Sequence, residues 1–298
     1  GQPTHTAEER EALVQQAHVI YTAFPFPRTL VTRAPNLIWA HFGFAGVSNL
    51  MNTPWWNAPV LITSSRGSWN PLPIAESVIA AAFMFARKLD AAVRKSAAHE
   101  YDGAPYREAK LIAGKTMAIV GLGGIGSHVA RLARACGMRV VATRSSVTER
   151  TENVDGVDVL YPAAALPEML AEADFIAVCT MWTPETQGLL NAAAFAAVKP
   201  GAYLMNIARG EVIEESALAE ALHSGRLAGA YLDVWNDDMN GVPPSATLQG
   251  APNIVFTPHV SGRSDVASQI GADLLCENLR RLLNGEPLIN LIDWSRGY

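Results

Sequence analysis

The sequence is poor in cysteine, in excess positive charge and in long apolar runs. Its three cysteines, at positions 136, 179 and 276, are too widely spaced for a metal site or a disulfide framework. The formal net charge of −5 offers no basic surface for nucleic acid or for an anionic membrane. The longest strongly apolar stretch, residues 78–86, is too short to cross a bilayer, and no secretory signal opens the chain. These absences predict a cytoplasmic protein without a metal site, a nucleic-acid partner or a membrane span.

A glycine-rich turn lies within residues 117–146, MAIVGLGGIGSHVARLARACGMRVVATRSS. An apolar strand pattern leads into Gly121, Gly123 and Gly126, and an amphipathic helix and a second strand follow; this context is typical of dinucleotide binding. Gly121 allows the tight turn, Gly123 lets the backbone approach a pyrophosphate, and Gly126 lets helix and strand pack closely. The free N–H groups of the helix N-terminus can then bind phosphate oxygens. An ordinary turn between a strand and a helix is the alternative.

The end of the second strand indicates which dinucleotide is bound. NAD-binding units usually carry an Asp or Glu there, which accepts hydrogen bonds from the ribose hydroxyls. This chain has Arg144, Ser145 and Ser146 instead. Because the Arg144 guanidinium can hold a 2′-phosphate through two parallel hydrogen bonds, NADP is the predicted cofactor. A solvated surface arginine is the alternative.

Short apolar runs alternate with helical patterns along the chain. The runs expected to form strands are 18–22, 36–41, 60–63, 117–120, 139–143, 175–179, 203–206, 228–232 and 254–257. Strands that alternate with helices predict an α/β fold with parallel, doubly wound sheets, and 298 residues suffice for about two domains.

A long helix predicted over residues 74–98 divides the chain. Its apolar residues lie nearly all round it at first, so we expect it to be buried at a junction between domains or subunits. We predict a substrate-binding domain over residues 1–73, completed by residues 266–298 with a last helix at 265–283. A dinucleotide-binding domain is predicted over residues 74–265. A cleft between the two lobes is the expected place of a small substrate.

Further motifs carry a family resemblance. They are PNLIWAHFGFAGV, TPETQGLL, NIARGEVIEESALAEAL, LAGAYLDV and NIVFTPHVSG. Together with the glycine turn they resemble the D-isomer-specific 2-hydroxyacid dehydrogenases, most closely the glyoxylate and hydroxypyruvate reductases that use NADPH. The resemblance covers nearly everything from residue 36 to the C-terminus. It implies a Rossmann-type dinucleotide domain and a flavodoxin-like substrate domain, with NADPH-dependent reduction of a small 2-keto acid to the D-2-hydroxy acid.

The resemblance assigns two catalytic groups directly. Arg209 corresponds to the family's catalytic arginine, whose planar guanidinium holds the substrate carboxylate and polarises the adjacent carbonyl. His259 corresponds to the histidine that gives a proton to the carbonyl oxygen as hydride arrives. Without this framework, a histidine before a turn is more often a surface or structural residue.

The third catalytic position departs from the family pattern. The family's glutamate falls at Asp238, within NDDM where Glu-x-Glu-Pro is usual, and the loop after it aligns only with an insertion. Aspartate is one methylene shorter, so it reaches the imidazole only if the loop lies closer to it. Asp237 is the rival candidate, and a solvated acidic loop is the remaining alternative.

The same resemblance implies further residues that contact the cofactor and the substrate. Backbone and side-chain contacts to the cofactor are implied for Gly124, Ile125, Ile207, Ala208, Asp233 and Gly262, with Asp233 at the nicotinamide carboxamide. The backbone at Ala45 and Gly46 is implied to receive the substrate carboxylate, because small residues let the main chain come close. The family's first strand is missing, so we expect a trimmed or divergent start, whereas the C-terminal end matches as if complete.

Two alternatives to the reductase remain open. The same fold serves dehydrogenases of formate and phosphite, and the shortened acid keeps that reading possible. Corepressor-like proteins that sense a dinucleotide also share the fold; the intact Arg209 and His259 argue against this reading, and the changed acid argues weakly for it. The sequence therefore predicts an NADPH-dependent reductase of small 2-keto acids, as a homodimer built on the helix at 74–98.

Overall fold

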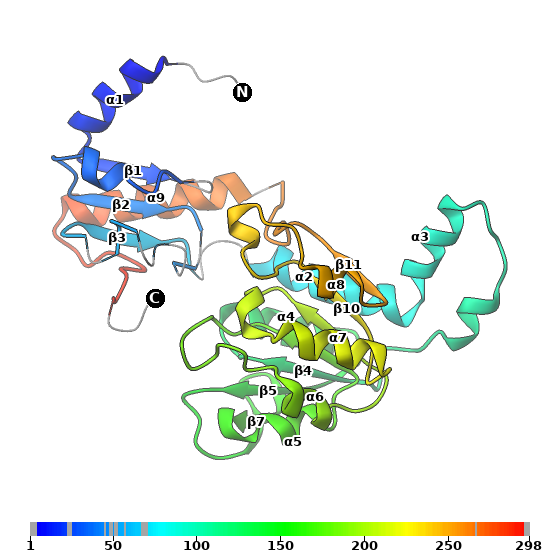
Figure 1. Cartoon of the computed structure of the whole chain (residues 1–298). Coiled ribbons are helices and arrows are strands. Elements are labelled where there is room, and N and C mark those ends of the chain that lie inside the picture. Colours follow the sequence, from blue (N-terminus) through cyan, green and yellow to red (C-terminus); the bar gives the residue numbers. More distant parts are fainter. Residues whose placement is uncertain are drawn as a thin grey trace. The chain divides into compact units, whose positions relative to one another are not determined.

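The computed structural model describes residues 5–22, 26–44, 46–47, 50, 53–56, 58–66, 71–265 and 267–294, with no side chains described at 267–271. The chain divides into two compact units, Gly1–Asn70 with Ser264–Tyr298 and Pro71–Arg263 (Figure 1). The chain passes from one unit to the other after residues 70 and 263, whereas the sequence predicts these changes after residues 73 and 265. In the part of the chain that is described, no helix is long and apolar enough to cross a membrane.

The larger unit is built on an eight-stranded sheet with the order β11-β10-β9-β8-β4-β5-β7-β6. Its strands are β4 (Thr116–Val120), β5 (Arg139–Arg144), β6 (Thr151–Val154), β7 (Val157–Pro162), β8 (Phe175–Val178), β9 (Ala202–Asn206), β10 (Leu227–Leu232) and β11 (Ile254–Phe256). All neighbours are parallel except β6 and β7. The strand order reverses between β4 and β8, and open α/β sheets bind ligands at the carboxyl ends of such a reversal. The predicted α/β fold with a parallel sheet is confirmed.

Helices cover both faces of this sheet (Figure 1). The described helices of this unit are α2 (Pro71–Ala86), α3 (Leu89–Ala97), α4 (Gly124–Ala135), α5 (Leu166–Leu170), α6 (Ala192–Ala197), α7 (Glu215–His223) and α8 (Ala246–Gln249), of which α3 does not lie on the sheet. Successive residues of a strand point to opposite faces, so Met117 and Ile119 join the core under α2 and α4, whereas Ala118 and Val120 join the core under α5, α6 and α7. The strand β4 is therefore buried on both sides, as its continuous apolar run indicates.

The hairpin β6–β7 corrects the sequence prediction, in which no strand occurs between residues 143 and 175. Asp155 and Gly156 connect the two strands, with φ of +52° and +78°. Two-residue hairpin turns need positive φ at both positions, and Asp-Gly is a preferred pair for them. The signal was therefore present in the sequence, as Asp-Gly flanked by a valine on each side.

The helix predicted over residues 74–98 is also corrected, because the structure has two helices there. α2 ends at Ala86 and α3 begins at Leu89. Lys88, between them, has φ of +59°, a left-handed conformation that a right-handed helix cannot pass through. α2 buries residues along most of its length, whereas no residue of α3 is buried. Figure 1 shows α3 standing away from the sheet of its own unit.

The smaller unit holds a parallel sheet of β1 (Val19–Thr22), β2 (Trp39–Phe42) and β3 (Leu61–Ser64), in that order. α1 (Ala7–Gln16), the short helix Leu30–Arg33 and α9 (Ala267–Leu283) belong to the same unit. Its core includes Phe42, Leu50, Trp55 and Ile62.

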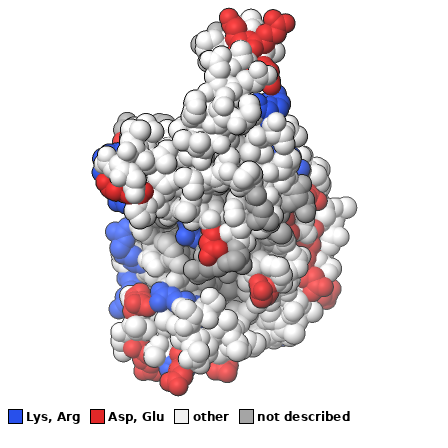
Figure 2. All heavy atoms as spheres, turned by 90° about the vertical axis from the view of Figure 1, so that its left-hand side faces the viewer, with Lys and Arg blue, Asp and Glu red and all other residues white. Residues whose placement is uncertain are grey.

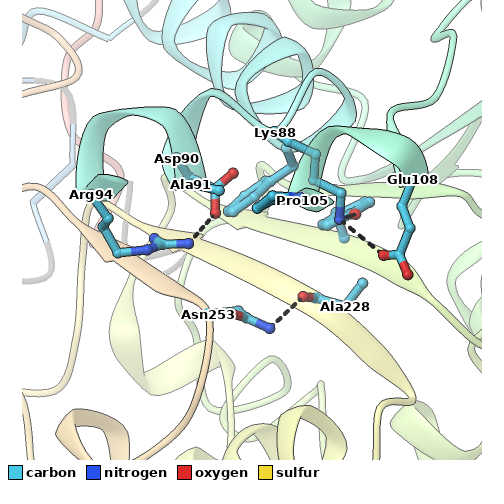
Figure 3. Close-up of a pocket in the computed structure, with 10 residues that line it drawn as sticks. Lys88, Asp90, Ala91, Arg94, Pro105, Glu108, Ala228 and Asn253 are labelled. Carbon is cyan, nitrogen blue, oxygen red and sulfur yellow. Dashed lines mark hydrogen bonds and ion pairs between the residues drawn. The ribbon is translucent and has the colours of Figure 1, made fainter. Parts of the chain in front are cut away.

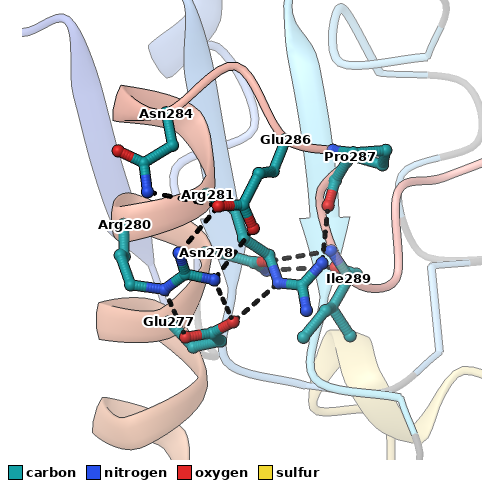
Figure 4. A network of polar contacts seen from close by, with 8 residues as sticks. All are labelled: Glu277, Asn278, Arg280, Arg281, Asn284, Glu286, Pro287 and Ile289. Atoms are coloured by element: carbon teal, nitrogen blue, oxygen red, sulfur yellow. Dashed lines mark hydrogen bonds and ion pairs between the residues drawn. The ribbon is translucent and has the colours of Figure 1, made fainter.

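Polar contacts on α9 attach the C-terminal segment to this smaller unit (Figure 4). Glu277 binds Arg280 and Arg281, and Arg280 also binds Glu286. Asn278, which is fully buried, bonds both the N–H and the carbonyl of Ile289 at 2.8 and 3.0 Å. The chain that follows then pairs with β3, where Ile292 donates to the carbonyl of Ile62.

Charged side chains are mixed on the surface. On the face drawn in Figure 2, acidic and basic residues are scattered among uncharged ones, and the described part of that face carries no broad basic patch. The picture agrees with the net charge of −5.

Candidate active site

The glycine turn after β4 is shaped by two close backbone approaches. Gly121 has φ of +98°, and a Cβ there would lie 2.9 Å from the backbone nitrogen of Thr180. A Cβ at Gly126 would lie 2.3 Å from the carbonyl oxygen of Gly121. Around Gly123 and Gly124, in contrast, an added Cβ would meet nothing within 4 Å. Since the first N–H groups of α4 lack intrahelical acceptors, the open side of this turn fits a pyrophosphate.

The neighbouring strand β5 braces the turn. The Thr143 hydroxyl accepts a hydrogen bond from Gly121 N at 3.2 Å, and the Thr143 carbonyl accepts one from Leu122 N at 2.8 Å. Thr143 was not singled out from the sequence. In the sequence, Thr143 could have been recognised as a hydroxyl residue, rather than an apolar one, near the end of a buried strand.

Arg144 ends β5 beside the glycine turn. Its Nε donates to the Leu122 carbonyl at 3.2 Å, and its Nη1 pairs with Asp155 Oδ2 at 2.5 Å. The arginine side chain is about one third exposed, and Ser145 and Ser146 follow it in an exposed turn. The guanidinium therefore stays near the glycine turn. A phosphate bound there would compete with the Asp155 carboxylate, which already contacts the guanidinium.

The loop after β9 holds Arg209 through a buried side chain. Asn206 Nδ2 donates to the Arg209 carbonyl at 3.0 Å, and Asn206 Oδ1 accepts from Ala208 N at 3.0 Å. Ile207 and Ala208 are buried, whereas Arg209 is half-buried. Burial lowers the pKa of the Arg209 guanidinium, and the carboxylates of Asp238 and Glu211 oppose that effect. The group remains a cation at any working pH.

Gly210 brings this loop against the loop that follows β10. A Cβ at Gly210 would stand 2.1 Å from the carbonyl carbon of Trp235 and 2.3 Å from the backbone nitrogen of Asn236. The two loops that carry Arg209 and Asp238 are thus in direct backbone contact. Gly210, like Asn206, was not singled out from the sequence.

His259 and Asp238 are in direct contact. His259 Nδ1 lies 2.7 Å from Asp238 Oδ2, and Asp238 Oδ1 accepts from Met239 N at 2.7 Å. The side chain of Asp238 is 6% exposed and that of His259 is 33% exposed. Because Nδ1 faces the carboxylate, Nε2 is the ring nitrogen left for proton transfer.

The rival Asp237 lies differently. It has φ of +61°, its side chain accepts from Asn240 Nδ2 at 3.1 Å, and the residue is exposed. The left-handed conformation turns the chain at this point, so the structure brings Asp238 rather than Asp237 to the imidazole.

The chain is similar to known proteins in sequence and in fold. Residues 79–261 match the family described as D-isomer specific 2-hydroxyacid dehydrogenase, NAD binding domain. The chain belongs to this family. The D-3-phosphoglycerate dehydrogenase of Bacillus subtilis is 35% identical over 234 residues, which are 78% of this chain and 43% of that protein. The chain spans about half the length of the curated relatives that it matches.

Solved structures of the family share the whole fold. A D-isomer specific 2-hydroxyacid dehydrogenase family protein of Aeromonas salmonicida is 31% identical, with a TM-score of 0.84 over 98% of this chain and 90% of that one. The NADPH-dependent glyoxylate/hydroxypyruvate reductase of Sinorhizobium meliloti, in complex with NADP and sulfate, is 27% identical. Its TM-score is 0.80, over 95% of this chain and 89% of that one.

The remaining predicted positions of this family member lie in both units. Asp233, after β10, is fully buried and accepts hydrogen bonds only from residues 257–261 among the contacts described, and Gly262 directly follows that segment. In the smaller unit Gly46 follows β2 and is half-buried, whereas Ala45 lies outside the described residues. No group of three or more metal-ligating side chains occurs among the residues that the structure describes.

Proposed function

We propose that this chain reduces a small 2-keto acid to the D-2-hydroxy acid with NADPH. The observation that carries the proposal is the convergence of Arg209, Asp238 and His259. They lie on the loops after β9, β10 and β11, which are three neighbouring parallel strands. Their side chains therefore come from one carboxyl edge of the sheet, to which the glycine turn after β4 also belongs.

Each group has a separate task in this reaction. The Arg209 guanidinium binds the substrate carboxylate and draws electron density from the adjacent carbonyl oxygen. His259 gives the proton on Nε2 to that oxygen and takes it back in the reverse direction. Asp238 keeps the ring oriented through its contact with Nδ1. A dinucleotide held with its pyrophosphate at the glycine turn would supply the hydride for the carbonyl carbon from its nicotinamide.

NADP as the preferred cofactor is the finer part of the proposal. Arg144, Ser145 and Ser146 support it, since they offer one cation and two hydroxyls where NAD-binding units carry a carboxylate. The Sinorhizobium relative was solved with NADP, which is in line with this choice. The carboxylate of Asp155 beside Arg144 limits the preference, because it repels a phosphate dianion.

A turnover assay tests the reaction. Glyoxylate, hydroxypyruvate, pyruvate and phenylpyruvate are each offered with NADPH or NADH, and cofactor absorbance is followed. We expect reduction of at least one of these acids, no reduction of matched aldehydes that lack the carboxylate, and a loss of ~10²-fold in kcat/KM for Arg209→Lys. Oxidation of formate or phosphite without keto-acid reduction, or tight cofactor binding without turnover, would instead support the two other readings.

We infer further that the chain acts in the cytoplasm as a homodimer, with α3 and its flanks as the interface. Leu89, Val93, Tyr101 and Leu111 are 50%, 71%, 82% and 72% exposed, although all are apolar or aromatic. Apolar side chains in such number on a projecting segment favour burial against a second copy.

The smaller unit, with the backbone at Gly46 and Ala45, takes the substrate-binding role in the same proposal.

A small polar cavity lies beside α3 (Figure 3). It has a volume of about 200 Å³, and Lys88, Asp90, Arg94 and Glu108 are among its lining residues. Asp90 Oδ2 accepts from Arg94 at 2.8 Å, but Oδ1 is buried with no hydrogen-bond partner within the described ranges. Because Oδ1 is closed off inside the unit, the proposed interface rests on the exposed apolar side chains and not on this cavity.

Light scattering tests the interface. The unmodified protein should have the mass of a dimer, and Val93→Glu should have that of a monomer. Leu283→Glu is the matched control, because Leu283 is 78% exposed on α9 of the other unit. A monomeric unmodified protein, or a dimeric Val93→Glu variant, would contradict the proposed interface.

A further inference from the structure

The carboxylate of Asp233 holds the segment that carries His259. Thr257 Oγ1 donates to Asp233 Oδ1 at 2.5 Å, and Val260 N donates to the same oxygen at 3.0 Å. Ser261 N donates to Asp233 Oδ2 at 3.0 Å. All three donors lie within residues 257–261, on both sides of the histidine. Asp233 has no exposed surface, so its charge is stabilised by these bonds and not by water.

The backbone of His259 is held from the same direction. His259 N donates to the carbonyl oxygens of Asp233 and Thr257 at 2.8 and 2.9 Å. His259 has φ of +54°, a left-handed conformation that is strained for a residue with a Cβ atom. A residue keeps such a conformation only where its surroundings impose it. Here Asp233 accepts four hydrogen bonds from the segment, three at its carboxylate and one at its carbonyl, whereas the Leu232 carbonyl and the Tyr231 hydroxyl each bond only Thr257.

We propose that Asp233 is a positioning residue for His259, in addition to any contact with the nicotinamide. Asp233 sets the course of residues 257–261, and this course directs Nδ1 of the imidazole to Asp238. Two carboxylates from the loop after β10 thus act on one histidine, Asp233 through the backbone and Asp238 through the ring. The proposal rests on the proposed role of His259 as proton donor.

Four variants separate the positioning of His259 from a role of Asp233 in cofactor binding alone. Asp233→Asn keeps one acceptor oxygen and leaves an N–H of the segment unpaired. Thr257→Val removes the 2.5 Å bond at nearly constant shape, and Thr257→Ser keeps it. Tyr231→Phe is the matched control. The Tyr231 hydroxyl lies 2.8 Å from Thr257 Oγ1, so its loss removes a neighbouring hydrogen bond but leaves the bond between Thr257 and Asp233.

The first readout needs no turnover. The ring proton on Nδ1 of His259, which faces Asp238 Oδ2 at 2.7 Å, is followed by NMR at one fixed pH in the cofactor-free protein, with His259→Gln used to assign the signal. In Asp233→Asn and Thr257→Val we expect this signal to move upfield or to be lost to exchange with water, because the ring loses its alignment with Asp238. Thr257→Ser and Tyr231→Phe should keep the signal of the unmodified protein. An unchanged signal in both Asp233→Asn and Thr257→Val would overturn the proposal.

Cofactor affinity and turnover give the second readout. We expect kcat to fall by ~10²-fold in Asp233→Asn and by ~10-fold in Thr257→Val, while the Kd for NADP⁺ changes by less than ~3-fold. A tenfold or greater rise in Kd with an unchanged Nδ1 proton signal would assign Asp233 to the cofactor alone. If Asp233→Asn fails to fold, the comparison of Thr257→Val with Thr257→Ser still decides. An unmodified protein without keto-acid reduction would overturn the proposed function, and the Nδ1 proton signal would still test Asp233.

Discussion

Gly210 lies so close to Trp235 that a side chain at position 210 would overlap the peptide bond between Trp235 and Asn236. The contact is backbone against backbone, so no rotamer change can relieve the overlap. It joins the loop of Arg209 to the loop of Asp238 and thereby fixes the spacing between the group proposed to bind the substrate and the group that supports the proton donor.

Gly210→Ala should therefore separate the two loops. We expect kcat/KM to fall by ~10²-fold, because displacements of ~1 Å at reacting groups have that effect, and the free energy of unfolding to fall by about 2 kcal/mol. Gly103→Ala is the control, since a Cβ there meets nothing within 4 Å and φ is −90°. Steady-state kinetics and urea unfolding measure both effects. Full activity in Gly210→Ala would show that the loop spacing does not matter.

Cofactor choice should depend on Arg144. We expect kcat/KM with NADPH to exceed that with NADH by at least ~10-fold, or about 1.4 kcal/mol, and Arg144→Asp to reverse the order. Asp155→Asn serves as the companion variant, because removal of the carboxylate 2.5 Å from Arg144 Nη1 should increase the preference for NADPH. Equal efficiency of both cofactors in the unmodified protein would contradict the assignment.

The stability of the smaller unit should depend on pH through His41. His41 is fully buried in β2, with Nδ1 2.7 Å from the Thr63 hydroxyl. Burial lowers the pKa of His41 from 6.5 to about 4. The unfolded chain therefore binds a proton as the pH falls below about 6.5, whereas the folded unit does so only near pH 4. Stability is complete above this window and is lost as the pH falls through it.

The size of the effect follows from the width of that window. A separation of about 2.5 pH units corresponds to roughly 3 to 4 kcal/mol at most. Urea unfolding at pH 7.5 and at pH 4.5 measures the loss in the free energy of unfolding between these two pH values. His41→Gln should show a smaller loss than the unmodified protein over this range, and His223→Gln, at an exposed position of α7, should not. Parallel pH curves for His41→Gln and the unmodified protein would rule out His41 as the cause.

Local patterns in the sequence predict the glycine turn and the strands, because each depends on a few adjacent residues. Gly121 needs its positive φ and Gly126 its close packing wherever this unit folds, so the spacing alone indicates both. The break between α2 and α3 at Lys88 depends instead on the residues packed around the end of α2. No glycine or proline at residues 86–89 indicates it in the sequence. The hairpin at Asp155 and Gly156 was missed although its turn residues were visible.

The choice between Asp237 and Asp238 could not be made from the sequence. It depends on φ of +61° at Asp237, which sets which of two adjacent carboxylates turns inward. That conformation follows from how the loop packs, and Gly210 takes part in that packing from a different loop. The positioning contacts of Asp233 are equally non-local, since its partners lie 24 or more residues away.

The pairing of His259 with Asp238 can be tested against its neighbour. Keto-acid reduction needs an imidazole that is held in place, and the Asp238 carboxylate contacts Nδ1 of the ring at 2.7 Å. Asp238→Asn replaces the carboxylate at this contact and should lower kcat by ~10²-fold. Asp237→Asn removes an equal charge one residue away, on a side chain bonded to Asn240, and should leave kcat within ~3-fold of the unmodified protein. Steady-state kinetics compare the two variants. A kcat that falls only in Asp237→Asn would make Asp237 the partner in the active enzyme.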